Sequence, residues 1–289
     1  MIILKMNKLR HKKKYALSVG SKLDTSGWLS VSCCYGNTLN FAACANDTNS
    51  QYNINVSTDG GSSWSTKQTI GQWKSVSCCY DGSNLNLIAC ELDGGDVYVS
   101  TDGGSNWERQ TIGLDMGYWS SVSCCYGNGN LNLIACASLD YVYVFKNRDT
   151  NWVRYFVNST NEFQQWSSVS CCYDGTNLNL IACCVEGRVY VSTNGGENWE
   201  DQTENITNEQ RDWSSVSCCY GNENLNLIVC QYGGYVYVST DGGASWTPQT
   251  GNGIETGSWS SVSCCYGNEK LNLIACSEPG HVYVSTDGG

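Results

Sequence analysis

The chain of 289 residues is poor in several residue types and patterns. It has two His, two Pro and no apolar run near the ~18 residues that a membrane-spanning helix needs. Charged residues make up 15%, and 27 acids against 16 bases give a formal net charge of −11. Such an acidic body excludes a protein that grips nucleic acid through its phosphates. A hydrophobic content of 41% excludes a chain that is disordered throughout.

The motifs of several enzyme classes are missing as well. The sequence contains no G-x-S-x-G, P-loop, H-E-x-x-H or dinucleotide-binding fingerprint. A zinc site of the usual Cys and His spacing is not expected, because His11 and His281 are the only histidines. We therefore predict no metal and no cofactor.

The first 14 residues differ from the rest of the chain. They hold six basic residues and no acid. We predict a basic disordered tail over residues 1–14, with a nuclear-import or anion-binding patch as the alternative. The apolar residues come before the basic run, whereas a signal peptide has them after it. An intracellular location is therefore expected, although an extracellular or particle-associated one stays open.

Six near-copies of one unit fill the remainder of the chain. Each opens on a version of W-S-S-V-S-C-C-Y, and the copies begin near residues 28, 73, 119, 166, 213 and 259. The spacing of 45–47 residues is that of a propeller blade. Repetition at this period predicts one domain over residues 15–289.

Each copy contains four predicted strands and no helical periodicity. In the third copy strand a covers 121–126 and strand b covers 131–136. In the second copy strand c covers 97–101 and strand d begins at Trp107. Apolar residues occupy both alternating sets of strand b, so both faces of each sheet must be covered. This pattern predicts an all-β fold, a six-bladed β-propeller of four-stranded antiparallel blades.

The last copy stops at Gly289, before its strand d. Tyr15 precedes Trp28 by 13 residues, as Trp246 precedes Trp259. We therefore predict that residues 15–19 complete the sixth blade and close the ring.

A second motif follows strand c, at residues 57–64, 100–107, 192–199 and 239–246. Its pattern, S-x-D-x-G-x-S-W, resembles the Asp-box or bacterial neuraminidase repeat (BNR). The whole unit is similar to uncharacterised Asp-box propellers and, more distantly, to photosystem II assembly-factor and sialidase propellers. The resemblance implies the fold but no function.

The Asp-box residues are expected to be structural. Gly accepts a positive φ in the turn, the Asp caps backbone N–H groups, and the Trp packs between blades. The third copy, at 145–152, loses most of the cap, so its hairpin should be looser. The structural residues are Asp59, Trp64, Asp102, Trp107, Asn194, Trp199, Asp241, Trp246 and Asp287.

The 19 cysteines recur as one Cys pair and one strand-b Cys in every copy, with Cys184 as an extra. Full intrachain pairing is impossible because the count is odd. Adjacent strand residues point to opposite faces, so a bridge within a Cys-Cys pair would be strained. Buried free thiols are the favoured interpretation. Interblade disulfides and metal-binding thiolates are the alternatives.

Two faces of the predicted propeller differ in sequence. The a–b and c–d turns emerge on one face and are nearly identical in every copy; we call this the uniform face. The b–c and d–a connections emerge on the opposite, variable face, which is acidic and favours basic protein partners. The predicted binding residues are Asp93, Asp96, Asp140, Tyr141, Glu186, Arg188, Tyr232, Tyr235, Glu278 and His281.

These features predict a non-catalytic interaction, structural or assembly module. A protein partner or self-assembly is the leading expectation. A lectin-like carbohydrate binder is the alternative, suggested by Tyr141 and Tyr235 as exposed aromatic residues. A degenerate sialidase-like glycosidase is the third candidate, but it needs an Arg cluster. Arg109 and Arg154 are expected towards the uniform face, so no such cluster is predicted.

Overall fold

The computed structural model describes most of the six repeats. Both the expected basic tail, 1–14, and the expected closing strand, 15–19, lie outside the described residues. The described residues are 27–46, 52–68, 71–92, 94–110, 117–146, 151–155, 157, 164–185, 187–206, 212–250, 256–278 and 281–289.

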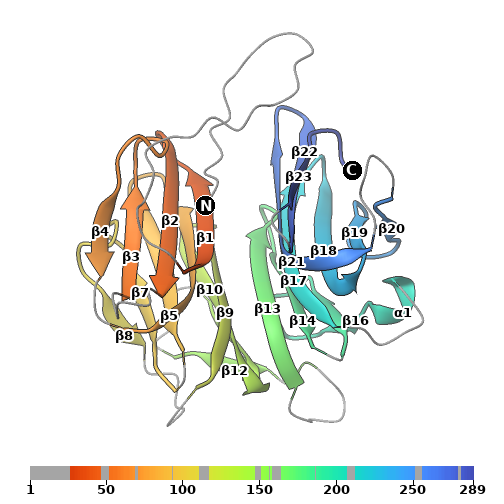
Figure 1. Cartoon of the computed structure of the whole chain (residues 1–289), viewed down its shortest axis with the longest axis horizontal. Helices are drawn as coiled ribbons and strands as arrows, with labels where there is room; N and C mark the ends of the chain where they lie inside the picture. Colours follow the sequence, from red (N-terminus) through yellow and green to blue (C-terminus); the bar gives the residue numbers. More distant parts are fainter. Residues whose placement is uncertain are drawn as a thin grey trace.

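Six antiparallel blades follow one another in chain order (Figure 1), as the repeats predict; strand pairing joins the third blade to the fourth and the fifth to the sixth, so the six blades form four sheets. In the first three blades the strands are β1 (Trp28–Tyr35), β2 (Leu39–Asn46), β3 (Tyr52–Ser57), β4 (Ser65–Gln68); β5 (Trp73–Tyr80), β6 (Leu85–Glu91), β7 (Val97–Ser100), β8 (Glu108–Gln110); and β9 (Trp119–Gly127), β10 (Asn130–Asp140), β11 (Val142–Phe145), β12 (Val153–Tyr155).

The other three blades repeat this order, with one helical turn added after the fourth. The elements are β13 (Gln164–Tyr173), β14 (Leu178–Cys184), β15 (Val189–Ser192), β16 (Glu200–Asp201), α1 (Thr203–Ile206); β17 (Trp213–Gly221), β18 (Asn224–Gly234), β19 (Val236–Ser239), β20 (Thr247–Pro248); and β21 (Gly257–Gly267), β22 (Lys270–Glu278), β23 (His281–Ser285).

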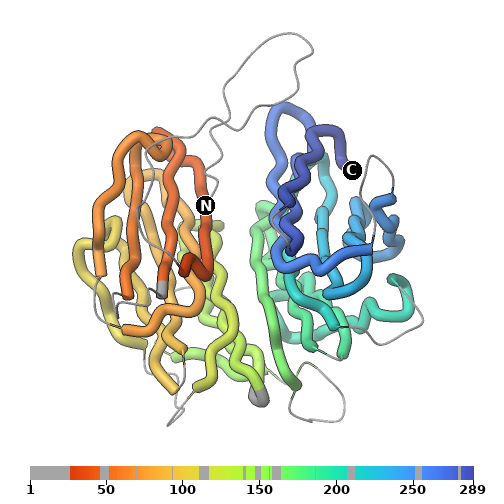
Figure 2. Tube along the Cα trace, viewed as in Figure 1, coloured from red at the N-terminus to blue at the C-terminus, as the bar shows by residue number. Residues whose placement is uncertain are grey.

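The first strand of each blade lies innermost. These strands, β1, β5, β9, β13, β17 and β21, contact one another in chain order, so the blades succeed each other around the molecule (Figure 2). The chain is a six-bladed β-propeller. Within the described residues five blades have four strands and the sixth has three.

The core lies between the blades. Leu87 and Ile88 are neighbours on β6 that point to opposite faces, yet both side chains are fully buried. The Trp that opens a blade sits in the same layer: Trp73 packs edge-on against Tyr98, with ring centroids 5.4 Å apart. Both-sided burial explains why strand b is apolar at consecutive positions.

No helix among the described residues is long and apolar enough to cross a membrane.

Candidate functional site

Hydrogen bonds define the two ends of each blade. At the uniform face the Asp-box turn is tied to the start of strand b, for example by the N–H of Gly103, which donates to the carbonyl of Leu85 at 2.9 Å. At the variable face a residue near the end of strand b is tied to a residue near the start of strand a. There the N–H of Ser138 donates to the carbonyl of Tyr118 at 2.7 Å. The predicted division into two faces is thus present in the structure.

The Asp-box of the first blade is a closed set of hydrogen bonds. Asp59 Oδ1 accepts from Ser57 Oγ at 2.8 Å and from the N–H of Ser63 at 2.9 Å. Ser57 Oγ in turn accepts the N–H of Gly61 at 2.9 Å. Bonds from the Ser63 hydroxyl and N–H lower the pKa of Asp59 to about 2. This carboxylate is committed to its own turn.

The other described boxes repeat this geometry. Asp102 accepts the N–H groups of Ser105 and Asn106, and Asp241 accepts that of Ser245. Asn194 keeps one of these contacts through its amide oxygen, 2.9 Å from the N–H of Asn198. Asp287 accepts the Ser285 hydroxyl at 2.7 Å.

The box tryptophans are packed as expected. The rings of Trp107, Trp199 and Trp246 pack against interblade clusters, and that of Trp64 lies 6.1 Å from Phe41. The described boxes therefore bond within their own turns and pack between blades; residues 147–150 of the third copy lie outside the described part of the chain.

Two rows of residues make up the described part of the variable face. The inner row lies where strand a begins and strand b ends, and there the backbone of one residue is bonded to that of the other. It consists of Gln72 with Leu92, Tyr118 with Ser138, Gln165 with Val185, Asp212 with Tyr232, and Ser258 with Glu278.

The inner row is variable in chemistry and open to solvent. Tyr118 is 58% exposed and Tyr232 is 57% exposed, whereas a buried core aromatic such as Trp213 is wholly enclosed. Val185, Asp212 and Glu278 are exposed as well. The row therefore combines aromatic, apolar, amide and acidic side chains along one circular path.

Only Tyr232 and Glu278 of the inner row were predicted as binding residues. Tyr118 was missed because it lies directly before the Trp of its repeat and reads as the end of a loop. Comparing that single position across the copies would have found it, since Gln72, Tyr118, Gln165, Asp212 and Ser258 all differ in kind from the constant Trp that follows.

The outer row lies at the start of strand c in the second to sixth blades. It comprises Asp96, Tyr141, Arg188, Tyr235 and His281, all predicted binding residues. In three blades a residue of strand d engages it. Arg109 Nε lies 2.6 Å from Asp96 Oδ2, Arg154 stacks 4.5 Å above the ring centre of Tyr141, and Asp201 pairs with Arg188.

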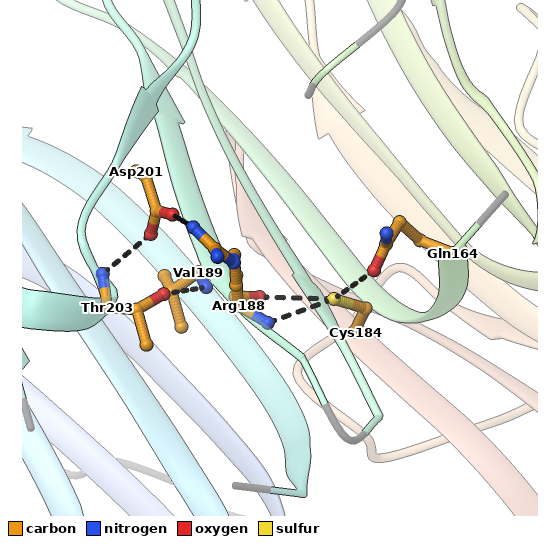
Figure 3. A network of polar contacts seen from close by, with 6 residues as sticks. All are labelled: Gln164, Cys184, Arg188, Val189, Asp201 and Thr203. Atoms are coloured by element: carbon orange, nitrogen blue, oxygen red, sulfur yellow. Dashed lines mark hydrogen bonds and ion pairs between the residues drawn. The ribbon is translucent and has the colours of Figure 1, made fainter. Parts of the chain in front are cut away.

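The fourth blade carries the most extensive of these networks (Figure 3). The guanidinium of Arg188 donates a hydrogen bond to Asp201. The backbone N–H of Arg188 donates to Cys184 Sγ at 3.0 Å. Asp201 also accepts the N–H of Thr203 at 2.9 Å, at the start of α1. Burial would raise the pKa of Asp201, but the bonds from Thr203 and Arg188 lower it.

Two expectations about this face were wrong. Arg109 and Arg154 lie at the variable face, because strand d is only three residues long and their side chains reach the start of strand c. Tyr141 and Tyr235 are not freely exposed aromatics: Tyr141 lies under Arg154, and Tyr235 packs edge-on against Tyr237.

The remaining predicted residues are only partly placed. Asp93 and Glu186 lie outside the described residues, and of Asp140 only the backbone, at the end of β10, is described.

Comparison with known proteins agrees with this geometry. The BNR/Asp-box repeat family matches residues 190–201 and 237–248, which run from strand c through the box into strand d of the fourth and fifth blades. Both segments match the Asp-box pattern read from the sequence. No curated protein matches the chain in sequence.

Solved propellers of three kinds share the fold. YCF48 bound to a D1 peptide is 17% identical with a TM-score of 0.61, over 94% of this chain and 82% of that one. A fucose lectin from Aleuria aurantia, a six-bladed propeller, is 12% identical with a TM-score of 0.56, over 92% and 97%. A Trypanosoma rangeli sialidase with sialic acid is 11% identical with a TM-score of 0.57, over 90% and 54%.

Three arginines of this propeller are already engaged. Arg109, Arg154 and Arg188 stand in three different blades, and each is held by a partner in its own blade. The described residues therefore bring no three guanidinium groups to one point, as recognition of a sialic acid carboxylate would need.

All 19 cysteines are present as free thiols, and most are buried, as expected. A pairing that the sequence did not reveal joins neighbouring blades: the second Cys of one W-S-S-V-S-C-C-Y strand shares a side-chain hydrogen bond with the first Cys of the next. We call these the interblade thiol pairs. They are Cys34–Cys78, Cys79–Cys124, Cys125–Cys171, Cys172–Cys218 and Cys219–Cys264.

Mutual hydrogen bonding and burial raise the pKa of Cys78, Cys79, Cys125 and Cys172 well above the usual value, so these thiols stay protonated. In the described part of the chain no three His, Cys, Asp or Glu residues are grouped as a metal site would require.

Proposed function

We propose that this protein is a non-catalytic interaction module, which binds a segment of a protein partner across the inner row of its variable face. The single observation that carries the proposal is the exposure of Tyr118 and Tyr232 on a ring of otherwise unlike side chains. Aromatic residues supply large contact areas at low entropic cost and dominate many interfaces.

The chemistry of the row favours a basic and partly apolar segment. Asp212 and Glu278 add negative charge beside the tyrosines, and the whole chain carries −11. Val185 and Leu92 offer apolar contact. Electrostatic attraction would steer a basic partner to this face.

The similarity to YCF48 supports a peptide ligand, since that propeller was solved with a D1 peptide. The uniform face offers a poorer site, because its Asp-box carboxylates already accept hydrogen bonds from their own turns. We therefore assign binding to the variable face and a scaffold role to the uniform face.

Selection of linear peptides from a display library on the full chain tests the proposal. The affinity of selected peptides would be measured by calorimetry. We expect Tyr118→Ala and Tyr232→Ala each to weaken binding about tenfold or more. Glu278→Gln should reduce the salt dependence of the affinity.

The matched control is Tyr220→Ala, because Tyr220 is a partly exposed tyrosine at the uniform face. It should leave the affinity unchanged. Equal losses in all three tyrosine variants, or none in any, would reject the inner row as the site.

A lectin is the second candidate, favoured by the same exposed tyrosines and by the shared fold of the fucose lectin. Binding to a glycan array that is released by free sugar and lost in Tyr118→Ala would support it over the peptide. Hydrolysis of a fluorogenic sialoside would instead revive the degenerate glycosidase.

A further inference from the structure

The five interblade thiol pairs follow from a simple rule of strand geometry. Neighbouring residues on a strand point to opposite faces, so each Cys-Cys dipeptide sends one thiol to each adjacent blade. Cys34 faces the second blade and meets Cys78. Cys33, beside it, must face the other way, and Cys265 of the sixth blade likewise points away from the fifth.

Two further contacts recur at the same interfaces. The N–H groups of Val76 and Cys78 donate to Ser30 Oγ and Ser32 Oγ, at 3.2 and 3.1 Å. The equivalent bonds are present at the other four described interfaces. At each of these interfaces one blade supplies the serine acceptors, and the next blade along the chain supplies the backbone N–H donors.

The third recurring contact is a tyrosine ring laid over a glycine of the preceding blade. Tyr80 covers Gly36 and Tyr266 covers Gly221 so closely that a Cβ on the glycine would lie 2.7 and 1.9 Å from the ring. In the first, third and fifth blades, which have glycine here, the ring fills the space a Cβ would need, whereas Asp81 and Asp174 stand at this position in the second and fourth blades.

The outward face of the first blade carries one half of each contact, and the outward face of the sixth blade carries the other half. Both sets of side chains are exposed. On β1, Val31 is 66% exposed, Tyr35 is 78% exposed and Cys33 is exposed. On β21, Ser261, Ser263 and Cys265 are exposed, and no atom of the described residues lies within 4 Å of a Cβ built on Gly267. The first blade thus offers N–H donors, the Cys33 thiol and the Tyr35 ring. The sixth blade offers the matching serine acceptors, the Cys265 thiol and Gly267.

We propose that Cys33 and Cys265 are the sixth interblade thiol pair and form an intramolecular disulfide that joins the first blade to the sixth under oxidising conditions. Unlike the five other pairs, this pair has two exposed thiols, which an external oxidant can reach.

The oxidant is a low-molecular-weight disulfide such as oxidised glutathione. The Cys33 thiolate attacks one glutathione sulfur, which breaks the S–S bond and releases one glutathione thiolate. The Cys265 thiolate then attacks the Cys33 sulfur and releases the second. Two protein thiols are oxidised, one glutathione disulfide is reduced to two thiols, and these take up the two protons.

The two thiols belong to one chain, not to two copies. Repeat symmetry assigns both thiols to the interface between the first and sixth blades, because Cys33 and Cys265 hold the two positions that are paired at the five other interfaces. Burial is the largest cause that raises the pKa of Cys33, to about 12, and Cys78 and Cys265 add smaller contributions. Exchange is therefore slow at neutral pH, and incubation must be long.

The test uses the full chain, incubated with oxidised glutathione and compared with a reduced sample. We expect two fewer alkylated cysteines, a Cys33–Cys265 cross-link in the peptide map, and a monomer on non-reducing electrophoresis. The melting temperature should rise by roughly 5–10 °C, because the bridge closes a long loop.

Matched controls come from the neighbouring cysteines, which point to the opposite faces. Cys33→Ser and Cys265→Ser should abolish the cross-link and the rise in melting temperature, whereas Cys34→Ser and Cys264→Ser should keep both. A cross-link that survives Cys33→Ser, a covalent dimer in place of the monomer, or no loss of free thiols would each overturn the proposal.

Discussion

The two faces of this propeller are held by different kinds of side-chain contact. At the uniform face every described box repeats one set of hydrogen bonds, around Ser57, Ser100, Ser192 and Ser239. At the variable face the contact between strands c and d differs from blade to blade. It joins Asp96 to Arg109 in the second blade, Tyr141 to Arg154 in the third, and Arg188 to Asp201 in the fourth.

The difference between the faces is one of burial. The serines of the boxes are 1–2% exposed, so a lost bond there strands a buried N–H group. The partners on the variable face are partly exposed, so water can solvate them and one pair can replace another at lower cost. Stability therefore restrains the uniform face and leaves the variable face free to diversify.

Removing one box serine should produce the largest effect. Ser100 Oγ accepts the buried N–H of Gly104 at 2.9 Å and donates to Asp102. Ser100→Ala leaves that N–H without a partner, and we expect a loss of about 1–3 kcal/mol in the free energy of unfolding, measured by urea denaturation.

The control for this prediction is Ser105→Ala in the same turn. The Ser105 hydroxyl is exposed and donates to the carbonyl of Asp102 at 3.2 Å, so its loss should change the free energy by less than about 0.5 kcal/mol. Similar losses in both variants would contradict the role given to burial.

Replacing the box carboxylate should have a smaller, pH-dependent effect. Bonds from the N–H and side-chain amide of Asn106 lower the pKa of Asp102 to about 2, below the value of about 3.9 in unfolded chains. The ionised form therefore stabilises the fold above about pH 4, and that contribution disappears as the pH falls towards 2.

Asp102→Asn removes this ionisation but keeps an acceptor, as Asn194 does in the fourth blade. We expect the variant to be slightly less stable than the parent at pH 7 and equally stable near pH 2, by urea denaturation across that range. A stability difference that does not depend on pH would show that the carboxylate charge is irrelevant to the turn.

The repeated parts of the molecule could be predicted from the sequence, since their causes are local. Consecutive apolar residues such as Leu87 and Ile88 indicate a strand covered on both sides, and the register of the Asp-box motif indicates the c–d hairpin. The outer row was also foreseen, because its residues adjoin strand c.

The features that were missed depend on contacts between distant segments. Arg109 reaches Asp96 only because strand d is short, which no local pattern announces. Tyr118 belongs to the inner row because its carbonyl accepts the N–H of Ser138, which lies on the neighbouring strand. The interblade thiol pairs depend on the spacing of inner strands from different repeats, so the sequence predicted burial of the thiols but not their partners.

Reversing an ion pair on the variable face should produce the smallest effect. The second blade pairs Asp96 of strand c with Arg109 of strand d, and the fourth blade has the opposite order in Arg188 and Asp201. The double change Asp96→Arg with Arg109→Asp recreates that order, so we expect the urea midpoint of the parent. Each single reversal puts like charges together and should lower the midpoint, by less than Ser100→Ala does and less still in 1 M salt. A double variant weaker than both singles would mean that this face is as tightly restrained as the other.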